Sequence, residues 1–276
     1  MIEICSTVLS IFFCLRFSNK GYFNFKNNIL KILGKFILYV LIWVYMIFKQ
    51  LFDKDSSTFT YLISCGVGRE LAIIDPVYNE IPKYLKILSE LNIQLVKVID
   101  THIHADHISG MAQLKKLANC ISIMGEQTSC EIVDIKVKEN EIIKIDELEL
   151  MSIYTPGHTN DSYCFSMKDR IFTGDTLLIN GTGRTDFQNG SSDEAYDSLF
   201  NKVLKQNDEI LVYPGHDYNG NKVSTIEKEK KTNPRLQVNS KSEYIEIMEN
   251  LNLKYPRMID IAVPANTKGF VDGKLE

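Results

Sequence analysis

The sequence predicts an α+β domain in which short strands alternate with amphipathic helices. Short apolar and β-branched runs recur along most of the chain, and segments with apolar residues at helical spacing separate them. Histidine and aspartate residues follow directly after several of these runs. The 276 residues are 45% hydrophobic and 24% charged, which is ordinary for a globular protein and leaves enough apolar side chains for a core. Together these features favour sheets covered by helices.

Residues 1–50 differ in composition from the rest of the chain. They hold six basic residues, one acidic residue (Glu3) and the single tryptophan (Trp43). Two apolar runs, Ile4–Phe17 and Phe36–Phe48, are both shorter than the roughly 20 residues that span a bilayer. We interpret residues 1–47 as a targeting leader or a membrane anchor, and residues 48–276 as one folded domain. An amphipathic segment packed on that domain is the alternative.

The sequence of the first half of the domain predicts a hairpin followed by alternating helices and strands. Gly66 and Gly68 lie in the expected hairpin connection, and Pro82 suits the first turn of the next helix. The expected elements are strands Ser57–Cys65 and Leu71–Asp75, helix Ile81–Leu91, strand Leu95–Asp100, helix His107–Ala118 and strand Ile121–Met124.

The second half predicts two hairpins and then mostly helices. Polar pairs at 146–147 and 168–169 form the expected turns, and Ser192 is a candidate helix N-cap. The expected strands are Glu141–Ile145, Leu148–Ile153, Tyr163–Met167, Arg170–Thr173 and Ile210–Tyr213. The expected helices are Ser192–Leu204, Ser224–Lys231 and Lys241–Leu251.

The segment THIHADH at residues 101–107 supplies most of the candidate metal ligands. Residues two apart in an extended segment point the same way, so His102 and His104 can address one point in space. The other two of the five histidines end strands in TPGHT and YPGHD, and an aspartate does so in TGDT. Zinc, iron and manganese all take imidazole and carboxylate ligands. The full candidate set is His102, His104, Asp106, His107, His158, Asp175 and His216.

This order of ligands, HxHxDH followed by a histidine, an aspartate and a last histidine, resembles the metallo-β-lactamase superfamily over about residues 48–266. The resemblance implies a four-layer αββα sandwich, with residues 48–276 as its catalytic domain. Two groups of that superfamily are similar to this chain. One is glyoxalase II, which hydrolyses glutathione thioesters, and the other is the glutathione persulfide dioxygenases, or sulfur dioxygenases.

The resemblance leaves two metal arrangements open. In the arrangement of glyoxalase II, two zinc, iron or manganese ions share Asp175 and activate a water molecule for attack on a thioester. One ion would take His102, His104 and His158, and the other would take Asp106, His107 and His216.

In the arrangement of the persulfide dioxygenases, one Fe(II) ion is held by His102, His158 and Asp175. Two histidines and one carboxylate leave positions open for substrate and dioxygen. The remaining candidates would surround and orient these three ligands. They are His104, Asp106, His107 and His216.

Segments around the ligands favour the dioxygenase group. Those that resemble it are QLFDKDSSTFTYL (50–62), GTGRTDFQ (181–188), YPGHDYNG (213–220), NPRL (233–236) and DIAVPAN (260–266). The resemblance therefore predicts an enzyme that uses O2 to oxidise glutathione persulfide to sulfite and glutathione, in sulfide detoxification. Thioester hydrolysis is the alternative. A binding module without catalysis is disfavoured because no candidate ligand is missing.

The resemblance also implies three substrate-binding residues, Arg184, Tyr218 and Arg235. A guanidinium group can grip a glutathione carboxylate with two parallel hydrogen bonds. Structural roles are the alternative, since Arg184 could bridge loops and Arg235 could lie on the surface after a proline.

Charge and cysteine content indicate partners and compartment. The chain carries a net charge of −4, and residues 1–50 contribute +5, so the remainder carries −9 (−4 minus 5). An acidic body argues against nucleic acid as a partner. Six scattered cysteines indicate free thiols in a reducing compartment. Residues 1–50 predict delivery to an organelle, either a mitochondrion or a plastid, with membrane contact through that segment as the alternative. No pattern indicates an oligomeric state.

Overall fold

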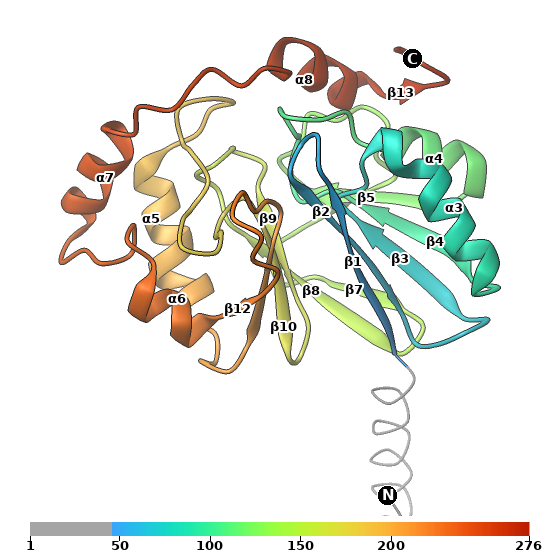
Figure 1. The fold of residues 1–276 in the computed structure, drawn as a ribbon, viewed down its shortest axis with the longest axis horizontal. Helices are drawn as coiled ribbons and strands as arrows, with labels where there is room; N and C mark the ends of the chain where they lie inside the picture. The colour runs from blue at the N-terminus through green and yellow to red at the C-terminus, as the bar shows by residue number, and fades with distance from the viewer. Residues whose placement is uncertain (1–45, 276) are drawn as a thin grey trace, which may run out of the picture. The chain divides into compact units, whose positions relative to one another are not determined.

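The computed structural model of the chain describes residues 46–275. The leader or anchor predicted for residues 1–47 therefore lies outside the described residues, except for its last two. The described part contains two six-stranded sheets that face each other, with helices on the outer side of each (Figure 1). The predicted αββα sandwich is confirmed.

The first sheet runs in sequence order from β1 to β6. Its first three strands are antiparallel neighbours, and its last four are parallel neighbours. The helices α3 (Ile81–Glu90) and α4 (Met111–Ala118) lie on its outer side (Figure 1). The strands are β1 (Ile47–Asp53), β2 (Thr58–Ser64), β3 (Glu70–Ile74), β4 (Gln94–Ile99), β5 (Ile121–Gly125) and β6 (Ile135–Val137).

The second sheet also keeps sequence order, from β7 to β12. Its neighbours are antiparallel except for β10 and β11. The helices beside it are α5 (Ser192–Asn201), α6 (Ile226–Thr232) and α7 (Lys241–Glu249) (Figure 1). The strands are β7 (Ile142–Ile145), β8 (Leu148–Tyr154), β9 (Tyr163–Ser166), β10 (Arg170–Gly174), β11 (Leu211–Pro214) and β12 (Ser224–Thr225).

Aromatic side chains join the two sheets. The ring of Tyr61 on β2 lies 4.9 Å from that of Phe172 on β10 and 5.7 Å from that of Tyr213 on β11, centroid to centroid. The Tyr61 hydroxyl donates to the carbonyl of Pro214 at 2.5 Å. Rings of this size supply a large buried apolar area, and the hydroxyl finds a partner, so these contacts hold the two sheets together.

The chain closes with α8 (Ile259–Lys268) and a small hairpin of β13 (Phe270–Val271) and β14 (Lys274–Leu275). Asp272 in this hairpin accepts from Gln113 on α4, at 3.2 Å. The C-terminal segment thus returns to the first sheet's side of the molecule (Figure 1). No helix was expected at 259–268, and α8 contains Pro264, a residue that normally disfavours a helix interior.

Several expected boundaries are wrong. The helix expected from His107 begins at Met111, since residues 107–110 form a loop around the site. The N-cap of α5 is Ser191, whose hydroxyl accepts from the backbone N–H of Glu194 at 3.3 Å. That helix ends at Asn201, and a 3-10 turn, Val203–Lys205, follows. Residues 224–225 pair with β11 as β12 instead of opening a helix. Three-residue 3-10 turns and two-residue strands are too short to show a periodic pattern of apolar residues, so the sequence could not predict them.

None of the helices within residues 46–275 combines the length and the apolar character that crossing a bilayer requires. The predicted anchor lies outside the described residues.

Candidate metal centre

The candidate ligands lie on four loops at one edge of the sandwich. The THIHADH segment follows β4, His158 follows β8, Asp175 follows β10 and His216 follows β11. Ile103 packs into the core beside α3 and α4, and so anchors this segment between two of its histidines. The strand ends therefore bring residues more than one hundred positions apart to one place.

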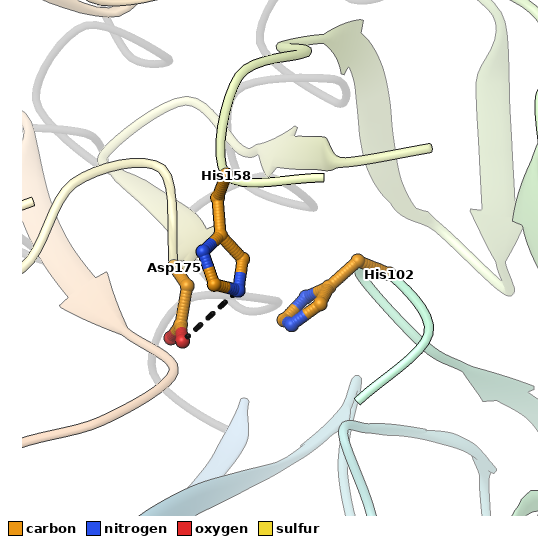
Figure 2. Close-up of side chains that lie close together, drawn as sticks. All are labelled: His102, His158 and Asp175. Carbon is orange, nitrogen blue, oxygen red and sulfur yellow. Dashed lines mark ion pairs between the residues drawn. The ribbon is translucent and has the colours of Figure 1, made fainter. Parts of the chain in front are cut away.

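Three ligand candidates from three of these loops converge. Figure 2 shows the side chains of His102, His158 and Asp175 pointing toward one another. Each offers a ligand atom within 4.8 Å of the other two, and His158 Nε2 lies 3.6 Å from Asp175 Oδ2. The spacing suits three ligands around one ion.

Hydrogen bonds select the ring nitrogen that each of the two histidines presents. His158 Nδ1 lies 2.7 Å from the carbonyl oxygen of Arg184, which can only accept, so Nδ1 carries the proton. His102 Nδ1 lies 2.9 Å from the hydroxyl of Thr101, whose own proton goes to Asp75 at 3.0 Å. In both rings Nε2 therefore keeps its lone pair, as a metal ligand requires.

The charge states of the trio also suit a cation. Burial lowers the pKa of His102 well below its usual value, and neighbouring His104 and His158 lower it further. Burial alone would raise the pKa of Asp175, but the facing His216, together with His158, brings it below the usual value. A carboxylate and imidazoles with free lone pairs therefore form the donor set, and these residues fit a divalent metal ion.

One ring nitrogen of His104 is bound to an aspartate outside this trio. Its Nε2 lies 3.2 Å from Asp75 Oδ1. Burial lowers the pKa of His104, but Asp75 outweighs it and the pKa is raised to about 9. Its Nδ1 has no hydrogen-bond partner although it is buried, and the same holds for His107 Nε2. An unsatisfied buried nitrogen costs about 1–3 kcal/mol, so a water molecule or a metal ion bound at either nitrogen would be stabilising.

The other three candidates bind one another. His216 Nδ1 lies 2.6 Å from Asp175 Oδ1, and His216 Nε2 lies 2.8 Å from Asp106 Oδ2. His107 Nδ1 lies 2.8 Å from the same Asp106 oxygen. Burial disfavours charge on His216, but Asp175 and Asp106 raise its pKa well above the usual value. His216 is thus held as an imidazolium between two carboxylates, and it steadies Asp175.

Two glycines permit this close assembly. A Cβ on Gly183 would lie 2.8 Å from the His158 ring and 2.2 Å from the carbonyl oxygen of Asp175. A Cβ on Gly215 would lie 2.7 Å from Asp175 Oδ1. Real side chains do not approach so closely, so any larger residue at either position would push the ligands apart.

A pocket of about 430 Å³ opens beside His158 and Asp175. Its volume falls in the range of small-molecule sites, roughly 300–1,000 Å³. All three predicted substrate-binding residues line it. The walls include Asn180, Arg184, Tyr218, Arg235, Leu253 and Lys254.

The two arginines of this pocket are partly engaged. Arg184 donates to both carboxylate oxygens of Asp186, at 2.6 and 2.7 Å, and to the carbonyl of Lys254 at 2.7 Å. Arg235 donates through Nη1 to the carbonyl and hydroxyl of Thr182. Within residues 46–275, Arg235 Nε and Nη2 make no hydrogen bond, so this arginine keeps donors for a ligand. Tyr218 is exposed, and its ring stacks on His216 at 6.1 Å.

Two supporting residues, Asp75 and Asn266, were missed from sequence. Asp75 accepts from the backbone N–H of Thr101 at 2.7 Å as well as from its hydroxyl. Asn266 donates to the carbonyls of His104 and His107, both at 2.9 Å. Asp75 also ends a strand, as the ligands do, and this signal could have marked it. Asn266 lies 159 residues after His107, and its contacts carry no sequence signal.

A model of the metallo-beta-lactamase superfamily matches residues 53–216. The chain belongs to the metallo-beta-lactamase superfamily. Family membership and the ligand cluster together identify a metal centre.

More specific similarities point to one group within that superfamily. The chain is 39% identical to the human mitochondrial persulfide dioxygenase ETHE1 over 226 residues, which cover 81% of this chain and 88% of that protein. It is 44% identical to ETHE1 from Myxococcus xanthus, whose crystal structure matches with a TM-score of 0.79 over 80% of this chain and 98% of that one. A probable hydroxyacylglutathione hydrolase of Schizosaccharomyces pombe is 32% identical, over 63% of this chain and 69% of that protein. The expected resemblance to persulfide dioxygenases, with glyoxalase II more distant, is confirmed.

Proposed function

We propose that this chain is a persulfide dioxygenase that oxidises glutathione persulfide to sulfite and glutathione, with one ferrous ion held by His102, His158 and Asp175. The observation that carries the proposal is the hydrogen bonding of the seven candidates. His102 and His158 each have Nδ1 in a hydrogen bond and offer a ligand atom within 4.8 Å of one from Asp175, whereas Asp106, His107 and His216 are bound to one another. The relatives named persulfide dioxygenase, at 38–39% identity over most of their length, support the same reaction.

The protein's part in this reaction is placement. When bound, ferrous iron would supply the electronic route by which triplet dioxygen reacts with a sulfur atom. The persulfide, one O2 and one water give glutathione and sulfurous acid, which ionises to sulfite. His216 fixes Asp175 through Oδ1 and leaves Oδ2 near His158 Nε2, and the carbonyl of Arg184 fixes His158. No side chain has to act as a nucleophile.

The substrate would bind in the pocket beside this trio. Arg235 has free donors for a glutathione carboxylate, and such charge-assisted bonds are worth about 1.5–3 kcal/mol. The exposed ring of Tyr218 offers an apolar surface at the rim. Arg184 would act chiefly by holding the pocket wall at Lys254 and by orienting His158 through its carbonyl.

Two assays on one sample test this proposal. Purified, iron-loaded protein should consume oxygen with glutathione persulfide and release one sulfite per O2, and should leave a glutathione thioester intact. Thioester cleavage without oxygen uptake, in protein that holds two ions per chain, would refute it. The unpartnered nitrogens of His104 and His107 are the observation that favours this second candidate, a dinuclear hydrolase.

The proposal extends to the organisation of the chain and its destination. We infer that residues 48–276 form the catalytic domain and residues 1–47 a leader to an organelle. The human, mouse and bovine relatives are named as mitochondrial, which favours a mitochondrion over a plastid.

A further inference from the structure

A threonine lies among the three candidates that would hold a second ion. Thr58 begins β2 and is fully buried. Its hydroxyl oxygen lies 3.1 Å from Asp106 Oδ2, 3.3 Å from His107 Nδ1 and 3.1 Å from His216 Nε2. One protein oxygen is therefore in hydrogen-bond contact with all three side chains.

The backbone holds this hydroxyl in place. Thr58 pairs across the sheet with Asp53 and forms a bridge to His216, and the next residue, Phe59, donates to the carbonyl of Gly215 at 2.7 Å. The hydroxyl of Ser56 lies 2.8 Å from that of Thr58. Since a β-branched side chain has few χ1 options, the Thr58 hydroxyl cannot easily turn away.

A second ion would need the space that these contacts fill. Metal ligands of this kind lie about 2.0–2.2 Å from their ion and point their lone pairs at it. Here Asp106 Oδ2 is the shared partner of His107, His216 and Thr58. The Thr58 oxygen occupies the side shared by Asp106 Oδ2, His107 Nδ1 and His216 Nε2, while His107 Nε2 on the other side of its ring has no partner. In the group His102, His158 and Asp175, the one side-chain hydroxyl contact within residues 46–275 is that of Thr101 with His102 Nδ1, which leaves Nε2 of that ring free.

We propose that Thr58 restricts the metal centre to one ion, by holding Asp106, His107 and His216 in a closed hydrogen-bonded cluster. This inference rests on the proposed one-ion function. Thr58 thereby acts as a specificity-determining residue, since the same seven ligands with two ions would suit hydrolysis instead of oxygenation.

Metal content of three proteins tests the inference. Wild type, Thr58→Ala and Thr58→Val are incubated anaerobically with excess Mn²⁺, desalted, and analysed by mass spectrometry for manganese per chain. Valine keeps the shape of threonine but lacks the hydroxyl, so this variant separates loss of the hydrogen bonds from loss of volume. We expect one ion in wild type and occupancy approaching two in both Thr58→Ala and Thr58→Val. Two Mn²⁺ ions about 3.5–4 Å apart would also show magnetic coupling by electron paramagnetic resonance.

The outcomes separate this inference from the proposed function. One ion in wild type and also in folded Thr58→Ala would overturn the role of Thr58 and leave the one-ion function standing. Two ions in wild type would overturn both. If Thr58→Ala fails to fold, Thr58→Val decides, because valine keeps the volume of threonine and lacks the hydroxyl. Occupancy above one at excess metal supports the inference, and an occupancy of one refutes it.

Discussion

Asn266 ties the last helix of the protein to the loop that carries four ligand candidates. It lies in α8, half-buried, and makes three hydrogen bonds to this loop. Its Oδ1 accepts from the backbone N–H of Ser109 at 2.8 Å, and its Nδ2 donates to the carbonyls of His104 and His107, both at 2.9 Å. Asn266→Ala would remove all three bonds and leave three backbone groups without these partners.

The expected loss follows from those bonds. Each is worth about 1 kcal/mol net, so the free energy of unfolding should fall by about 3 kcal/mol. For a domain of this size the melting temperature should drop by roughly 6–12 °C. The loop would also hold its histidines less firmly, and loss of such supporting contacts lowers metal affinity roughly 10–100-fold.

Thermal unfolding and metal titration of the same variant check this expectation. Asn250→Ala is the matched control, because Asn250 is exposed and its side chain makes one hydrogen bond, to the carbonyl of Glu246 at 2.7 Å. That variant should change stability by less than about 0.5 kcal/mol. If Asn266→Ala melted and bound metal like the control, the loop would be held by its own strand and the reasoning would fail.

Three further predictions concern the site and the leader. His158→Ala should lose the metal whereas His107→Ala should retain most of it, and equal losses by elemental analysis would argue for the dinuclear site. Burial raises the pKa of Asp100 from 3.8 to about 7, so the folded protein keeps a proton that the unfolded chain releases, and stability falls as pH rises from about 4 to 7. Asp100→Asn should flatten that fall, measured as the urea midpoint of metal-free protein at pH 5.5 and 8, and parallel pH curves would contradict this. A chain starting at Met46 keeps β1, so it should fold and bind metal, and insoluble protein would contradict this. Residues 1–45 fused to a fluorescent protein should reach an organelle, and diffuse fluorescence would contradict that expectation.

The sequence by itself determined the superfamily and all seven candidate ligands. Each follows a buried strand, and chains of this layered class carry polar side chains at strand ends, where loops meet at the edge of the sheets. Periodicity was sufficient for α3, whose apolar residues recur at helical spacing over ten residues. It failed for α8, because Pro264 and the short apolar run hide a helix that only packing stabilises.

Only the tertiary structure decided which ligands remain open. The proton position on His102 depends on Thr101, whose hydroxyl is bound by Asp75, 26 residues earlier in the chain. The proton position on His158 depends on the carbonyl of Arg184, 26 residues later. Thr58 reaches His216 across 158 positions of the chain. Hydrogen bonds act over about 3 Å in space whatever the separation along the chain, so no local pattern of residues could reveal them.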